Sequence, residues 1–392
     1  MRKAVFVVLG VLALAAQAPP DPVMTSYRAY RAALQAGDLN AAESAARAAW
    51  EASNSRDANG GRTGVLALNY AKVALANAHR APAHDAAQQA ATIAASAQPG
   101  GLDPLVARLV LGRTELLPGA RAQDVAQLFD ALNAAHGNAA AGGDALETAN
   151  DVGQWALSER HFQIAADSYE QAAAFSDFSP GDHDLARGEA RLGQGVALVT
   201  LATSSEVDEW GRGIGATGSN LHAHDQGDTY RQAQAALVQA EEALFPLAMQ
   251  PAADNRLTLA QRDYGLAHAW RTVINARLTS NQQTALPDPP INLRMRLPGT
   301  GPLCPIHVIA EPEARYAGGA AQHGEFGAVV ARLLINPDGT TRDAQVAAAV
   351  PDRFGASVAA VAPRWRVEKA PEATDDCQMQ PVVFYSIMFN LR

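Results

Sequence analysis

The fold of the C-terminal part of the chain is decided by one stretch, Phe326-Gly-Ala-Val-Val-Ala-Arg-Leu-Leu-Ile335 followed by Asn336-Pro-Asp-Gly339. Its first ten residues are mostly aliphatic and β-prone. The tetrapeptide after them has the composition of a turn, because Pro337 fixes φ and Asp338-Gly339 tolerate a chain reversal. A second extended run, Thr340 to Val350, follows directly. The sequence therefore predicts a β-hairpin here.

The spacing of apolar residues changes after this hairpin. Phe354, Val358, Val361 and Trp365 recur at steps of about 3.6 residues, which predicts one face of a helix. The chain then closes with its most β-prone segment, Gln380 to Leu391. We therefore expect a small β-β-α-β module at the C-terminus.

Composition indicates that the longer N-terminal part is helical. The chain has 392 residues, enough for two or three domains. It is 48% hydrophobic but only 6% aromatic, and alanine is by far its commonest apolar residue, which suits closely packed helices. The net charge is −9, and the acidic excess lies before Ile291. An acidic, lysine-poor helical region argues against binding nucleic acid, since phosphate contacts need clustered Lys and Arg.

The N-terminus has the pattern of a secretory signal. A basic start, Met1-Arg-Lys3, precedes an apolar run from Ala4 to Ala16, which is shorter than the about 20 residues that span a bilayer. We predict a signal peptide at 1–18, cut after Ala15 or Ala18, and a periplasmic protein that meets membranes only through its partners. The alternative is an uncleaved membrane anchor.

Between 24 and 279 a pattern of helix, short break and helix recurs with a period of about 38 to 40 residues, which is typical of an α-solenoid. In the first pair, Gly37 ends one helix and Asp38 caps the next. The predicted pairs are Thr25–Ala36 with Leu39–Ala52, Gly64–Arg80 with Pro82–Ala97, Asp103–Leu116 with Ala122–Ala135, Ala145–Ser158 with His161–Phe175, and Asp184–Thr203 with Tyr230–Phe245, followed by a closing helix, Leu257–Leu278.

This region resembles tetratricopeptide repeats at the small and aromatic positions where paired helices of that family approach closely. The matching residues are Gly37-Asp38-Leu39 with Ala42 and Ala49, and Val152-Gly153 with Phe162, Ala165, Tyr169 and Ala172. The resemblance implies a groove for peptides or protein partners, although no residue of this chain can be assigned to it.

One irregular segment, Ser204 to Asp228, is expected to be a long loop between two helices. Its glycines, within Trp210–Gly218, do not follow a predicted strand, so a phosphate-binding loop is disfavoured. His222, His224 and Asp225 alone are a weak metal-binding pattern, and a solvent loop or contact surface is the better interpretation.

A proline-rich linker, 280–302, separates the helices from the module at 303–392. Both cysteines, Cys304 and Cys377, lie in the module. An even cysteine count in an exported protein favours a disulfide, and each cysteine comes just before a predicted strand. The alternative is two unrelated thiols. A metal-bound or catalytic thiol is disfavoured, because no histidine shares a recognisable spacing with either cysteine.

Residues of about 304 to 392 resemble the TonB C-terminal domain family through an ordered set of positions. These are Tyr316 with Ala320, Gly324 and Gly327, Asp338-Gly339, the helix Phe354 to Ala362, Trp365-Arg366-Val367, Pro381-Val382 and Phe389-Asn390-Leu391. The chain departs from the family at Ala317, where a proline is usual, and at Glu368-Lys-Ala370. The resemblance implies a helix packed on an antiparallel sheet, whose edge strand pairs with a partner segment in energy-transducing members.

The closing strand has two apolar faces. One face, which we expect to pack on the helix, carries Val383, Tyr385, Ile387, Phe389 and Leu391. The other face carries Val382, Phe384, Ser386 and Met388. Those four residues either are covered by the linker, by a strand near Ile306 or by the repeats, or bind a partner.

The sequence thus predicts an α+β multidomain protein, with an α-solenoid followed by a TonB-like domain. We predict a non-enzymatic periplasmic adaptor that needs no cofactor or metal and engages periplasmic or outer-membrane proteins, with strand addition as one mode of binding. The alternatives are a TonB-type energy transducer with an uncleaved anchor, and an envelope enzyme or its accessory subunit. No nucleophile elbow, zinc motif or phosphate loop supports an enzyme.

Overall fold

The structure is a computed structural model that describes residues 21–96, 101–117, 120, 122–178, 183–211, 220–250, 256–280, 302–323 and 325–389. The predicted signal peptide (1–18) lies outside the described residues, as does nearly all of the predicted linker. The chain divides into two compact units, 1–114 and 115–392. The last helices and the C-terminal module share the second unit, whereas the sequence placed a domain boundary between them. Each unit is described by itself below.

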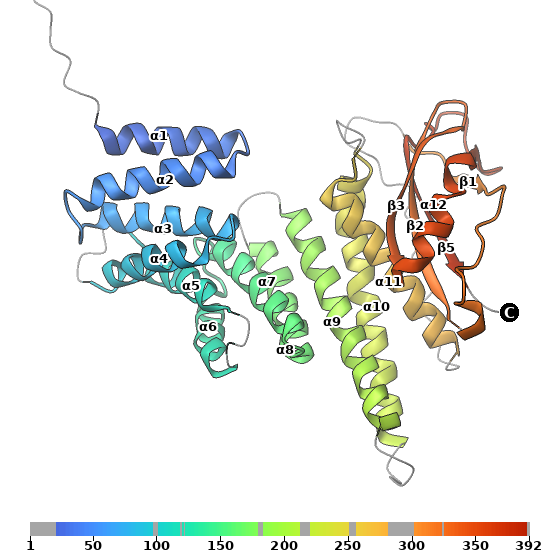
Figure 1. Cartoon of the computed structure of the whole chain (residues 1–392), viewed down its shortest axis with the longest axis horizontal. Helices are drawn as coiled ribbons and strands as arrows, with labels where there is room; N and C mark the ends of the chain where they lie inside the picture. Colours follow the sequence, from blue (N-terminus) through green and yellow to red (C-terminus); the bar gives the residue numbers. More distant parts are fainter. Residues whose placement is uncertain are drawn as a thin grey trace, which may run out of the picture. The chain divides into compact units, whose positions relative to one another are not determined.

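The first unit consists of helices that pair as antiparallel hairpins, α1 with α2 and α3 with α4 (Figure 1). Its helices are α1 (Pro22–Gln35), α2 (Leu39–Asn54), α3 (Gly61–Ala76), α4 (Arg80–Ala94) and α5 (Pro104–Glu115). Asp38 caps α2 by accepting a hydrogen bond from the Ala41 amide, as predicted. About half of the buried apolar side chains are alanines, which lets the helices approach closely.

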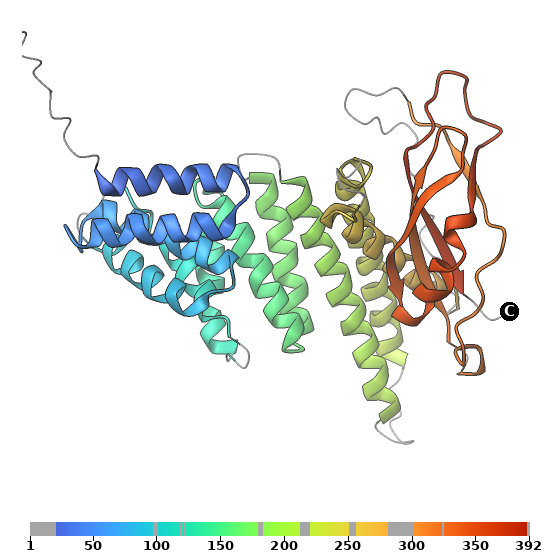
Figure 2. The same ribbon diagram turned by 45° about the horizontal axis from the view of Figure 1, so that its top comes forward.

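In the second unit, α7 pairs with α8 and α9 with α10, which lie side by side in both ribbon views (Figures 1 and 2). Its helices are α6 (Ala122–Ala135), α7 (Gly142–Ser158), α8 (Phe162–Phe178), α9 (Asp184–Gly211), α10 (Asn220–Ala248) and α11 (Leu259–Ser280). Helices occur in each predicted pair, and four of the pairs, α1–α2, α3–α4, α7–α8 and α9–α10, pack against each other as predicted. The long loop predicted for 204–228 is wrong, because α9 continues to Gly211 and α10 begins at Asn220. Within the described part of the chain, no helix combines the length and apolarity needed to cross a membrane.

Tyr169, one of the residues that resemble tetratricopeptide repeats, lies close to a glycine of each neighbouring helix. A Cβ added at Gly153 of α7 would lie 2.9 Å from the Tyr169 ring, and one at Gly193 of α9 would lie 2.6 Å from it. The two glycines therefore let both neighbouring helices close on one aromatic side chain of α8.

The C-terminal module contains two small antiparallel sheets. Its elements are β1 (Ile306–Ile309), β2 (Gly327–Ile335), β3 (Thr341–Val350), α12 (Gly355–Ala359), β4 (Arg366–Lys369) and β5 (Val382–Phe389), with short 3-10 turns at Ala321–His323, Asp352–Phe354 and Ala362–Arg364. Strand β1 pairs with β4, and the larger sheet has the order β3-β2-β5. The predicted hairpin is β2-β3, with Gly339 at φ +81° in its turn. The α+β multidomain architecture is confirmed.

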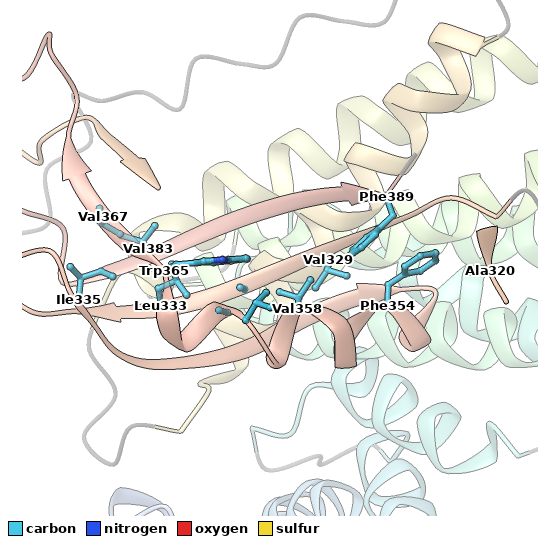
Figure 3. Close-up of a cluster of buried hydrophobic side chains, with 13 residues drawn as sticks. Ala320, Val329, Leu333, Ile335, Phe354, Val358, Trp365, Val367, Val383 and Phe389 are labelled. Carbon is cyan, nitrogen blue, oxygen red and sulfur yellow. The ribbon is translucent and has the colours of Figure 1, made fainter. Parts of the chain in front are cut away.

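One face of the larger sheet packs on α12 and its flanking turns, as the sequence predicted. Trp365 and Phe354 are buried, and Phe354 stacks on Phe389 at 4.7 Å (Figure 3). The Trp365 ring also meets the Tyr385 ring edge-on at 5.4 Å. Leu391, predicted for the same face, lies outside the described residues. The cluster of buried residues comprises Ala320, Val329, Ala331, Leu333, Ile335, Phe354, Val358, Val361, Ala362, Trp365, Val367, Val383 and Phe389.

The predicted disulfide is confirmed. Cys304 and Cys377 are bonded, and both are buried. The Cys304 amide also donates to the Gln378 carbonyl, and the Gln378 amide donates to the Pro302 carbonyl. The disulfide thus fixes the start of the module, just before β1, against the segment that leads into β5.

Candidate functional site

Helix α11 covers the second face of the β3-β2-β5 sheet. Its partly buried apolar side chains, together with buried Ala269, pack on small residues of β2 and β3. This cluster comprises Ala269, Ala328, Val330, Ala347 and Ala348, with Leu257, Leu266, Val273, Val350 and Phe384 against it. The sheet therefore has a core on both faces, one from its own helix and one from the last helix of the repeat region.

A buried arginine ties this second interface together. Arg332, in the middle of β2, is 1% exposed. Its guanidinium donates to the Gln261 side-chain oxygen at 2.8 Å and to the Arg256 carbonyl at 3.0 Å, and it lies 3.4 Å from the Asp343 carboxylate. Burial lowers the pKa of Arg332, and the Asp343 charge opposes that shift. Gln261 belongs to α11, so a strand of the module and this helix share one polar network.

Ionic contacts also join α11 to α10. The Arg271 side chain donates to the Glu241 carboxylate at 2.8 Å, and both side chains are buried. His268 lies 3.1 Å from the same carboxylate. One turn earlier, burial and then the Glu241 charge raise the pKa of Tyr264, which therefore stays neutral and serves as a packing residue.

The four residues considered for partner binding have different surroundings. Val382 is fully buried with Met249, Leu303 and Leu334. The Phe384 ring meets the Tyr264 ring of α11 edge-on at 4.9 Å.

Further along the same face, the Ser386 hydroxyl is buried and has no hydrogen-bond partner among the described residues. Met388 is 51% exposed. The repeat region thus covers much of the face, one of the arrangements that the sequence allowed. A partner-binding role for Val382, Phe384, Ser386 and Met388 stays a prediction.

No described strand lies along the outer edge of β5 in the larger sheet. Strand β5 pairs with β2 alone, in a continuous register from Gly327–Phe389 to Leu334–Val382, and no other described strand lies beside it. Every second residue of an antiparallel edge strand directs its N–H and C=O groups away from the sheet, so this edge offers unpaired donors and acceptors. Tyr385 and Ile387 are also half-exposed.

The opposite edge of the sheet, β3, is tied to its own module at its start. The Thr341 hydroxyl donates to the Trp365 carbonyl at 2.6 Å, and Thr340 bridges to Arg366. No described strand lies beside β5 in this way.

The described residues contain no group of three or more His, Cys, Asp or Glu side chains that could hold a metal ion. The side chains of His222, His224 and Asp225 lie outside the part of the chain for which side chains are described. The arrangement at β5 can bind an extended chain.

Comparison with known proteins agrees with this geometry. Residues 312–390 match the Gram-negative bacterial TonB protein C-terminal family. The match spans β2, β3, α12, β4 and β5, whereas α11, the disulfide residue Cys304 and strand β1 precede it. Neither a curated protein nor a solved structure matches the chain.

The part of the site that sequence reasoning missed is the role of α11. The signal was present in β2, where Arg332 interrupts an otherwise apolar run of nine residues. An arginine at that position needs acceptors from outside the sheet. In α11, Gly265 and Ala269 place two small residues one turn apart, which marks a face that another element approaches closely.

We expect Gly265→Ala to destabilise the second unit by about 1–3 kcal/mol, although alanine usually stabilises a helix interior. The reason is that a Cβ at Gly265 would lie 2.8 Å from the Cβ of Ala347, on a strand that cannot move freely. Urea unfolding, read by hydrogen exchange of β2 peptides, measures the change. The control is Gly143→Ala in α7, where an added Cβ meets nothing within 4 Å. Equal effects of the two substitutions would contradict close docking of α11.

Proposed function

We propose that the chain is a non-enzymatic, periplasmic protein-binding adaptor of the cell envelope that captures an extended segment of a partner on the edge of β5. The observation that carries the proposal is that no described strand lies beside the outer edge of β5, in a module that matches the TonB C-terminal family. Adding a strand there satisfies backbone groups that are otherwise left to water, and the side chains beside the edge supply selectivity.

The two covered faces of the sheet support this assignment. One face holds the core around Trp365, and the other holds α11, so neither face is free to receive a large apolar surface. Recognition by main-chain pairing at the edge needs no such free face. The half-exposed side chains of Phe384, Tyr385 and Ile387, with exposed Met388, flank the edge and fit alternate apolar residues of an added strand.

Helix α11 also supports the adaptor over the energy transducer. It fixes the module to the last helices of the same unit through Arg332 and the apolar cluster around Ala269. In a module held in this way, the β5 edge has a fixed position relative to the last helices of the same unit. Helical repeats of the tetratricopeptide type add a second surface of a kind that binds peptides or proteins.

Photo-crosslinking at β5 tests the proposal. With a photoreactive phenylalanine analogue in place of Met388 in the full chain, we expect crosslinks to one or a few envelope proteins in living cells. Leu259 is the matched control, because it is 54% exposed and also apolar but lies at the start of α11. Absence of adducts at position 388, or the same adducts at both positions, would argue against binding at this edge.

A further inference from the structure

A cavity of about 320 Å³ lies between helices α9, α10 and α11 of the second unit, which pack on one another (Figures 1 and 2). Helix α11 contributes Trp270, Val273, Ile274 and Arg277 to its wall. Their spacing of three and four residues places them on one face of the helix. Small-molecule sites in proteins have volumes of about 300–1,000 Å³, so this cavity is large enough to hold a ligand.

The rest of the lining of this cavity suits a hydrocarbon. Val199 of α9 and Tyr230 of α10 line it and are themselves buried. The hydroxyls of Thr200 and Thr203 also line it, but they donate at 2.8 Å to carbonyls of their own helix, one turn earlier. Because α9 already uses both hydroxyl protons, these threonines have no donor left for a ligand. A ligand body that makes no hydrogen bonds fits such a wall best.

Arg277 adds one cation to this apolar site. It also lines a second cavity, of about 390 Å³, between α11 and the C-terminal module. Its guanidinium carbon lies 5.3 Å from the centre of the Phe326 ring. A guanidinium in this position meets the ring with its face, and its N–H groups lie in the guanidinium plane, where a carboxylate can accept two of them.

The charges around Arg277 favour an anion. Glu325 and Arg353 line the second cavity and form an ion pair with each other, so their charges offset. Among the described residues that line the cavity between the helices, none is acidic. Arg277 therefore leaves the place where the two cavities meet with a net positive charge, which attracts a negatively charged group.

We propose that the cavity between α9, α10 and α11 binds an amphipathic carboxylate, a molecule with one carboxylate and a medium-length hydrocarbon chain. The chain fills the cavity, and the carboxylate accepts hydrogen bonds from Arg277. Such a ligand contacts all three helices and therefore stabilises the folded second unit by mass action. The site lies apart from the edge of β5, so the proposal does not depend on the proposed function.

Isothermal titration calorimetry of the purified full chain tests the proposal, with decanoate as the probe, kept below the concentration at which it forms micelles. We expect decanoate to bind with a stoichiometry of one. The uncharged analogue 1-decanol should bind at least about tenfold more weakly, because it lacks the charge-assisted hydrogen bonds to Arg277. Acetate, which has the head group without the chain, should show no saturable binding.

Two substitutions separate the head group from the chain. In Arg277→Gln, decanoate should lose its advantage over 1-decanol, whereas the affinity for 1-decanol should stay the same. In Thr200→Leu, the added methyl groups occupy part of the cavity, so both probes should bind at least about fivefold more weakly. The control is Arg342→Gln, an exposed arginine at the opposite end of β3 from the second cavity, which should keep the preference for decanoate.

Hydrogen-exchange protection of α11 and β2 shows in each variant that the second unit is folded. Equal affinities for decanoate and 1-decanol in the unsubstituted chain would overturn the proposal, as would an unchanged preference in folded Arg277→Gln. Binding of several decanoate molecules that Thr200→Leu does not weaken would indicate unspecific apolar contact and would also overturn it. Absence of any binding would show that the cavity is closed to ligands in solution, and the proposal would fall.

Discussion

Replacing Arg332 with methionine is expected to lower the free energy of unfolding of the second unit by about 1–3 kcal/mol. Methionine keeps the apolar stem of the side chain but removes the donor that joins the Asp343 carboxylate, the Gln261 side chain and the Arg256 carbonyl. The cost comes from these lost hydrogen bonds of a guanidinium that is itself 1% exposed. Urea unfolding, read by hydrogen exchange of β2 peptides, measures the change.

The matched control is Arg342→Met on the neighbouring strand β3. Arg342 is exposed, so its loss should change the free energy of unfolding by less than about 0.5 kcal/mol. If Arg332→Met behaved like this control, the network between the sheet and α11 would not contribute to the fold.

Removing the disulfide is the second large effect that we expect. Cys304 and Cys377 are 73 residues apart, and a crosslink that closes a loop of that length restricts the unfolded chain strongly. Cys304→Ala/Cys377→Ala should therefore lower the free energy of unfolding by about 2–5 kcal/mol. Denaturant unfolding of the oxidised chain and of the double variant gives the difference.

Reduction of the unsubstituted chain serves as the control for that experiment. The reduced chain and the double alanine variant should unfold at the same denaturant concentration, since both lack only the crosslink. A loss below about 1 kcal/mol in both would contradict a stabilising role for the crosslink. The segment leading into β5 would then be held by its backbone contacts alone.

Most of the helices and strands could be predicted from the sequence because their signals are local. Gly37-Asp38 indicates the end of one helix and the start of the next, and Asn336-Pro-Asp-Gly339 indicates a tight turn. Other breaks carry no such signal. Ala78 and Arg160 take positive φ values of 61° and 65°, as Gly37 does at 70°, yet neither is a residue that favours this conformation. The predicted helix Gly64–Arg80 therefore ran past its true end at Ala76.

The binding edge was harder to predict, because it depends on which elements meet across the sequence. Alternation in β5 indicates two apolar faces but does not say what covers the second one. The answer depends on α11, and the packing of Gly265 on Ala347 joins residues more than eighty positions apart. Similarly, the glycines at 211–218 suggested a loop starting at Ser204, but α9 continues through Gly211.

Native-state hydrogen exchange of the full chain tests most directly the claim that α11 and the TonB-like module share one core. If they do, the most protected amides of α11 and of β2 open with the same free energy, and Arg332→Met lowers both by the same amount. If Arg332→Met lowers the opening free energy of β2 but leaves α11 unchanged, the module is a separate tip. The claim that α11 holds the β3-β2-β5 sheet in one shared core would then be wrong.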